Sequence, residues 1–367
     1  MKTDGRRIER VAELDPGRLR EAEPLALKWF QAGGRTIFVR PQDWDHGTSP
    51  AAPAAERGGP QAGGRMGLDE TAGGMAGALL RDWRRARDMA VLACLAQHHY
   101  LSTGHLQALL GTSPRLTQMR MRRLEEWGLV TRWHQMEPRE VGGWRRHPDL
   151  FLLTARGAHV LARYRRIDSR ALIRRAFAAF HSAYHLEHAL GVNGFFASLI
   201  AASAQLPDQG LYHWLGDDGV RRAFAEQDPE VAPDGFGRYL TEDAEIGFHL
   251  EWDAGTEPPA RLRGKARAAL GAARGHLLWV APWQAREQTI RSALERESGG
   301  RVAGFWTTHA GLLREHGPLG EVWLGLEQVD RRRLTALPGR IRSALQIEDC
   351  LGKPGWWERR PGGTEGM

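Results

Sequence analysis

The chain has 367 residues, of which 51 are Lys or Arg and 44 are Asp or Glu, and its net charge is +7. Its two cysteines, Cys94 and Cys350, stand far apart without a CxxC pair, which argues against a disulfide framework and a cysteine-built zinc site. Neither a signal peptide nor an apolar stretch of about 18 residues is evident. We therefore expect a reduced, cytoplasmic protein with no membrane partner, built from two domains plus extra segments.

The basic residues are concentrated in one part of the chain. Residues 79–180 contain 19 Arg and no Lys against 8 acidic residues, a balance of +11, whereas the rest carries 32 basic and 36 acidic residues, a balance of −4. A positive surface confined to one domain favours phosphate as its partner.

Composition also divides the chain. Residues 1–44 are expected to be a partly ordered N-terminal segment. Residues 45–77 are rich in Gly, Ala and Pro and contain almost no large apolar residue, so they cannot offset their ordering entropy by burial, and a disordered linker is predicted. Two domains, 79–180 and 181–326, should follow, and residues 327–367 should form a basic C-terminal tail.

The first domain is predicted to be a winged helix-turn-helix centred on a helix between Ser113 and Gly128. Ser113 is a good N-cap, Pro114 suits the first helical position, and Gly128 suits the residue that ends the helix. At about 100° per residue, an apolar side and a polar side separate. The apolar side gathers Leu116, Thr117, Met121, Leu124 and Trp127, and the polar side gathers Arg115, Gln118, Met119 and Arg122, with Arg123 at its edge.

Such a helix suits the major groove of duplex DNA, where Arg and Gln read base edges. Residues 129–133 and 149–154 should form two strands of a wing. Residues 142–147 should form its glycine-flexible basic tip, and a closing helix should run from 154 to about 180. A three-helix bundle with a solvated charged face is the simpler alternative. The candidate DNA-binding residues are Arg115, Gln118, Arg122, Arg123, Arg145 and Arg146.

The second domain reads as alternating helices and strands. This order predicts an α/β domain with a central mixed sheet, so the fold class of the whole chain is α+β / α/β. The expected helices are 181–203, 260–273 and 285–296, and the expected strands begin near 214 and cover 231–239, 246–253, 277–282 and 302–308.

Two carboxylates in this domain resemble the acids of the PD-(D/E)xK nuclease fold. Asp234 follows a proline and matches the first acid, and Glu251 matches the second. The motif's lysine position holds Asp253, and the nearest lysine is Lys265 on the following helix. Carboxylates on adjacent strands can hold magnesium, so Asp234 and Glu251 are the candidate metal ligands of a magnesium-dependent nicking endonuclease. The blander alternative places Asp234 in a hairpin turn, with Glu251 and Asp253 outward on an edge strand.

Histidines at 181, 185 and 188 recur on one face of the helix that opens the second domain. They are either metal ligands or partly buried, hydrogen-bonded side chains, and the second interpretation is favoured. His188 could also line the acidic cleft. The candidate catalytic residues are therefore Asp234, Glu251, Asp253, Lys265 and His188.

Taken together, residues 85–325 resemble the replication-relaxation family of plasmid and mobile-element proteins. The resemblance implies a role in plasmid replication or in relaxing plasmid DNA. Its candidate partners are double-stranded DNA, a second copy of the chain, and replication or relaxosome proteins. A non-catalytic regulator or accessory factor is the main alternative, and a small-molecule-responsive transcription factor is a weaker one. The resemblance rests on His185, His188, Val192, Asn193, Pro233, Asp234, Gly235, Glu251, Asp253, Gly255, Thr256 and Glu257.

Overall fold

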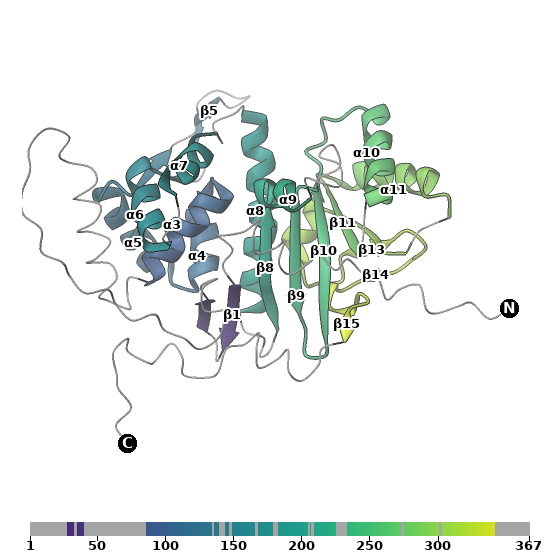
Figure 1. Ribbon diagram of the computed structural model, residues 1–367. Coiled ribbons are helices and arrows are strands. Elements are labelled where there is room, and N and C mark those ends of the chain that lie inside the picture. The colour runs from purple at the N-terminus through teal and green to yellow at the C-terminus, as the bar shows by residue number, and fades with distance from the viewer. Residues whose placement is uncertain are drawn as a thin grey trace, which may run out of the picture. The chain divides into compact units, whose positions relative to one another are not determined.

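The structure, a computed structural model, is a mixed α and β protein that divides into two compact units (Figure 1). One unit is formed mainly by residues 38–193 and the other mainly by residues 194–367. The expected linker, residues 45–77, lies outside the described residues. The structure describes residues 28–32, 35–39, 86–133, 136–138, 144–146, 149–165, 168–178, 183–204, 206, 209–224, 233–272, 275–300 and 303–341.

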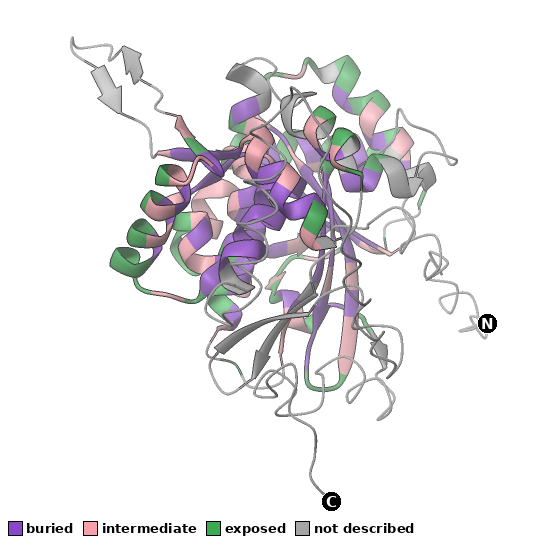
Figure 2. Cartoon of the chain, turned by 60° about the vertical axis from the view of Figure 1, so that its left-hand side comes forward, coloured by how far each residue is buried: buried purple, intermediate pink, exposed green. Residues whose placement is uncertain are grey.

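The unit of residues 38–193 is built from short helices around a core of buried leucines. Leu92, Leu95 and Leu106 are fully buried there. Figure 2 shows that its helices bury one side and expose the other, as amphipathic helices on a shared core do. The helices are α3 (Ala86–His98), α4 (Thr103–Leu110), α5 (Pro114–Glu126), α6 (Ala155–Arg165), α7 (Ser169–Ala178) and the first part of α8 (Ala183–Ser203).

Helix α5 begins and ends as its sequence predicts. The Ser113 hydroxyl accepts a hydrogen bond from the backbone N–H of Leu116, and Pro114 occupies the first helical position. At the other end Gly128 has φ of +67°, and the N–H of Leu129 donates to the carbonyl of Leu124. These bonds satisfy terminal backbone groups that the helix itself leaves free.

A small antiparallel sheet combines one strand that precedes α4 with two strands that follow α5. Its strand order is β3 (Leu101–Ser102), β7 (Leu150–Leu153), β4 (Val130–Trp133), so the two predicted wing strands pair. Between them, β5 (Met136–Pro138) pairs with β6 (Trp144–Arg146). The basic tip predicted as a flexible 142–147 loop is therefore partly strand.

The closing helix does not run unbroken from 154 to 180. Helix α6 ends at Arg165 and α7 begins at Ser169. The Asp168 carboxylate accepts the backbone N–H of Arg170, which is the bond that an acidic residue makes at a helix start. The expected closing helix is thus two helices, α6 and α7, rather than one.

The other unit is organised on a mixed sheet, eight-stranded within the described residues, in the order β14-β13-β12-β11-β10-β9-β8, with β15 pairing β10. Strands β10, β11 and β12 are parallel, and β8, β9 and β13 run antiparallel to their neighbours. Its strands are β8 (Gly210–Gly216), β9 (Gly235–Leu240), β10 (Ala244–Trp252), β11 (His276–Ala281), β12 (Phe305–His309), β13 (Trp323–Gly325), β14 (Arg331–Arg332) and β15 (Arg340–Ile341).

Two helices connect the parallel strands. Helix α10 (Pro259–Ala272) joins β10 to β11, and α11 (Gln284–Ser298) joins β11 to β12. Leu262 of α10 and Ile290 of α11 form one apolar cluster with Trp279 of β11. A second set of aromatic rings includes Phe196 of α8 stacked on Trp214, with centroids 4.9 Å apart. The remaining helices of this unit are α9 (Asp217–Phe224) and α12 (Ala310–His316), with a short 3-10 turn at Leu334–Ala336.

Two boundaries differ from those expected. The division between units falls at Asn193 and Gly194, inside α8, rather than at 180 and 181. Strands β14 and β15 and the fully buried Leu334 extend the sheet unit past residue 326, where the basic tail was placed. Within the described residues, none of the helices combines the length and the apolar character that crossing a bilayer requires.

Two further strands lie within the expected N-terminal segment. These are β1 (Lys28–Ala32) and β2 (Arg35–Val39), which pair with each other. Two glycines separate them in the sequence, a spacing typical of a tight hairpin.

Candidate functional site

The outer face of α5 carries three of the predicted DNA-binding residues. Arg115, Gln118 and Arg122 are all exposed, while Thr117, Met121 and Leu124 are buried on the opposite face. The structure therefore brings an arginine/glutamine face to the surface of a helix anchored from behind. A groove beside it is lined by Arg115, Gln118, Met119 and Arg122 together with Arg132 and Phe151.

Leu116 departs from the predicted apolar side. It was placed with the inward residues, but 56% of it is exposed. Position 116 lies about 100° before Thr117 on the helix, on the flank of the buried stripe rather than in its centre.

Arg123 is held by the unit's own side chains. Its guanidinium lies 2.6 Å from the carboxylate of Asp88 and over the ring of Trp127 at 5.0 Å. Arg120 pairs with the same carboxylate. Because Asp88 is fully buried, these two arginines neutralise a charge that water cannot reach. This pairing could not be predicted from local sequence, since Asp88 precedes Arg120 by 32 residues.

The predicted wing arginines lie on β6, and their side chains are outside the described part of the structure. Arg145 pairs in register with Glu137, and Arg146 pairs with Met136.

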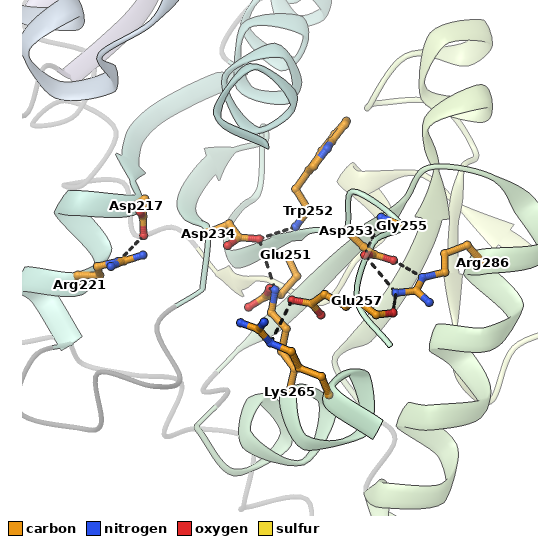
Figure 3. Close-up of polar contacts among 11 residues, drawn as sticks. Asp217, Arg221, Asp234, Glu251, Trp252, Asp253, Gly255, Glu257, Lys265 and Arg286 are labelled. Carbon is orange, nitrogen blue, oxygen red and sulfur yellow. Dashed lines mark hydrogen bonds and ion pairs between the residues drawn. The ribbon is translucent and has the colours of Figure 1, made fainter. Parts of the chain in front are cut away.

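A second group of candidate residues lies at the ends of β9 and β10. Asp234 immediately precedes β9, and Glu251 is the penultimate residue of β10, its antiparallel neighbour. The register pairs Gly235 with Leu250, so the two acids stand opposite each other. Lys265 reaches them from α10, with its Nζ 2.7 Å from Glu251 Oε2 and 3.9 Å from Asp234 Oδ2 (Figure 3).

This geometry contradicts the blander alternative for the acids. Gly235 begins a strand instead of forming a hairpin turn, and a side chain there would collide with the ring of Phe196. Strand β10 lies between β9 and β11, so it is not an edge strand. Glu251 and Asp253 are both buried rather than outward. Asp234 is partly exposed and accepts the backbone N–H of Trp252 at 2.7 Å.

The buried pair has strongly perturbed titration. Burial raises the pKa of Glu251 to about 8, Lys265 opposes the rise, and the nearby Asp234 charge adds to it. Burial alone would lower the pKa of Lys265, but the carboxylates of Glu251 and Asp234 outweigh burial and raise it. The ammonium therefore stays charged and holds the two acids together. Perturbed groups of this kind are common at functional sites, although structural ion pairs show them too.

Asp253 does not join this group. Both of its oxygens contact Arg286 of α11, with Nε 2.5 Å from Oδ2, and one oxygen also accepts the N–H of Gly255 (Figure 3). Arg286 donates further to the carbonyl of Glu257. The pair therefore fixes the turn after β10, where Gly255 has φ of +81°. Arg286 was not among the predicted site residues, because it lies 33 residues from Asp253.

The candidate residues of α8 lie in the unit of residues 38–193. His188 is half-buried there, and the side chains at 181 and 185 lie outside the described residues. Asn193 is buried, and its amide donates to the carbonyls of His98 and Tyr100 at 3.0 and 2.8 Å. This bonding holds the chain where it leaves α3, with His99 at φ of +61°, so it gives Asn193 a structural task.

Asp234 and Glu251 offer a donor set that suits magnesium, which needs one or two carboxylates plus water and a phosphate oxygen. Lys265 already neutralises part of that charge and would share Glu251 with the ion. The described part of the chain contains no group of three or more His, Cys, Asp or Glu side chains that could hold a metal ion. The protein would therefore hold a cation through two ligands, leaving the other positions to solvent and substrate.

The raised pKa of Glu251 predicts how the stability of the fold depends on pH. Because the folded state raises this pKa, the folded protein keeps the proton that the unfolded chain gives up near pH 4.5. This contribution to stability is complete below that pH and is lost as pH rises through about 8. Urea unfolding from pH 5 to 9 should show wild type losing stability relative to Glu251→Gln as pH rises. Glu242→Gln, which removes an exposed carboxyl, is the control for the loss of a charge. Parallel curves of unfolding free energy against pH for wild type and Glu251→Gln would contradict the raised pKa of Glu251.

Comparison with known proteins gives one result, a match that includes parts of both units. The family model described as Replication-relaxation matches residues 92–268. This confirms the family resemblance predicted from the sequence, and the matched stretch includes α5, Asp234, Glu251 and Lys265 but not Arg286. No match was found among curated proteins or solved structures.

Proposed function

We propose that this chain, which matches the replication-relaxation family model over residues 92–268, binds duplex DNA of a plasmid or mobile element during its replication or relaxation. One observation carries the proposal: α5 exposes Arg115, Gln118 and Arg122 on one face and buries the opposite face. A helix anchored in this way can enter a major groove, where Arg reads guanine and Gln reads adenine.

The surrounding elements support the interpretation of this unit as a winged helix-turn-helix. Helices α3, α4 and α5 precede the antiparallel pair β4 and β7, and the β5–β6 ladder lies between those strands in sequence. The exposed arginines of α5 would meet base edges, and the basic segment at 144–146 would meet phosphate. Asp88 supports this surface indirectly, because it orients Arg120 and Arg123 from beneath α5.

Separate replacements on α5 and on the wing should distinguish base contacts from phosphate contacts. Arg122→Ala should weaken binding to a selected site by about 1–3 kcal/mol and relax its sequence preference. Arg145→Ala and Arg146→Ala should weaken all sequences alike and reduce the salt dependence by nearly one phosphate each. Binding isotherms of the full chain on selected and random duplexes, at several salt concentrations, measure both effects.

Arg261→Ala is the matched control for loss of an exposed arginine, since 77% of its side chain is exposed and it lies on α10, in the compact unit that does not contain α5. It should leave the preference among sequences unchanged. A full chain without salt-dependent duplex affinity would overturn the proposed function.

The arrangement of Asp234, Glu251 and Lys265 favours a second activity, magnesium-dependent nicking of the bound DNA. The helix, antiparallel strands, helix and parallel strand from α8 to β11 supply the order expected of a restriction-endonuclease-like domain. Asp234 and Glu251 would hold the cation, and Lys265 would stabilise charge developing on the phosphate. A bound magnesium ion would supply polarisation of the phosphodiester and activation of water. A non-catalytic regulator with the same DNA-binding face is the alternative.

A further inference from the structure

The centre of the outer face of α5 is apolar. Met119 is 59% exposed, and Leu116, one turn earlier, is 56% exposed. On a helix of 3.6 residues per turn, Met119 falls opposite the midpoint of the buried stripe formed by Thr117, Met121 and Leu124. Met119 is therefore the side chain of α5 that points most directly away from this buried stripe.

Charged and polar side chains surround this apolar centre. Arg115, Gln118 and Arg122 lie on the same face, and they line one groove together with Met119. Single exposed apolar residues are ordinary on protein surfaces. Two of them at i and i+3, framed by hydrogen-bond donors on a well-anchored helix, make a surface with a defined chemical pattern.

This pattern matches the floor of a major groove that contains thymine. Thymine is the base that presents a methyl group there, at C5, whereas the other groove edges present hydrogen-bond donors and acceptors. The arginines and the glutamine can satisfy those polar edges, but a thioether cannot. The unbranched methionine side chain can adapt its shape to a methyl group beside it.

We propose that Met119, with Leu116 beside it, recognises thymine through its C5 methyl group and so helps to set the sequence preference of the protein. The proposal rests on the proposed function, because it requires α5 to lie in the major groove. The occupant is DNA rather than another protein, since exposed arginines border the apolar centre and match phosphate and guanine.

The test removes the methyl group from the DNA and its partner from the protein. Duplexes that bind the full chain are first selected from a random pool. Each thymine of a selected duplex is then replaced singly by uracil, which lacks only the methyl group, and affinities are measured by fluorescence anisotropy. At one or two positions, uracil should weaken binding by about fourfold, the effect of leaving one methyl group unburied.

Met119→Ala should abolish that difference, so that thymine and uracil duplexes bind equally. Leu116→Ala should reduce the difference at the same or a neighbouring position. Alanine suits a helix and Met119 is exposed, so the variant should stay folded, which circular dichroism verifies. Val329→Ala, at a residue 95% exposed elsewhere, is the matched control and should keep the full thymine preference.

Two outcomes overturn the inference in different ways. If the selected duplexes bind equally well with thymine or uracil at every position, Met119 reads no methyl group while the proposed DNA binding survives. If Met119→Ala changes the oligomeric state in size-exclusion chromatography and leaves uracil discrimination intact, the apolar centre is a protein interface. Failure of the full chain to bind any duplex would sink the proposed function itself.

Discussion

Replacing Asp253 with Asn is expected to lower the free energy of unfolding by about 3–5 kcal/mol, the cost of leaving one member of a buried ion pair without its partner. The side chains of Asp253 and Arg286 are only 2% and 10% exposed. Arg286 cannot shed its proton to escape burial. Urea unfolding of the full chain at neutral pH measures the loss.

The double variant Asp253→Asn with Arg286→Met tests whether the pair is the cause. Removal of both charges should cost less than the sum of the two single losses, because the stranded guanidinium is gone. Asp243→Asn, an exposed aspartate between β9 and β10, should change stability little. A small loss for Asp253→Asn, together with loss of a magnesium response, would return Asp253 to the role of metal ligand.

The two candidate surfaces differ in how far the sequence could predict them. The ends of α5 follow from Ser113, Pro114 and Gly128, because capping depends on residues within one turn of the helix end. Its polar face follows from the helical period. The outward position of Leu116 does not follow, since at the flank of a buried stripe the neighbouring elements decide whether a side chain is covered.

The group formed by Asp234, Glu251 and Lys265 could likewise be predicted only in part. The pairing of Asp234 with Glu251 could be predicted, because both acids lie near the ends of strands that are consecutive in the described fold. Lys265 was expected from the following helix, and the structure places it within 2.7 Å of Glu251. The pairing of Asp253 with Arg286, apart from the other two acids, could not be predicted. It lies two residues after Glu251, but its partner Arg286 comes from a helix that no local spacing connects to it.

The acids and the lysine at β9, β10 and α10 lead to the prediction with the largest effect on activity. If the full chain nicks supercoiled plasmid in the presence of magnesium, Asp234→Asn should abolish the nicking. The substitution removes a ligand charge at nearly constant shape, and the amide oxygen can still accept the N–H of Trp252. Duplex affinity should be unchanged, because the predicted DNA-reading residues lie on α5. Agarose electrophoresis of plasmid and a parallel binding assay measure the two quantities.

The melting temperature provides a readout that does not depend on turnover. Magnesium should raise it in the wild-type protein, since two carboxylates that share Lys265 gain a second counterion, and it should raise it less in Asp234→Asn. Glu242→Gln, which removes an exposed carboxyl from the turn between β9 and β10, should respond as wild type does. A melting temperature that magnesium leaves unmoved, with plasmid that stays supercoiled, would contradict the nicking activity. Asp234, Glu251 and Lys265 would then form a structural ion-pair network at the ends of β9 and β10 in a DNA-binding protein without catalysis.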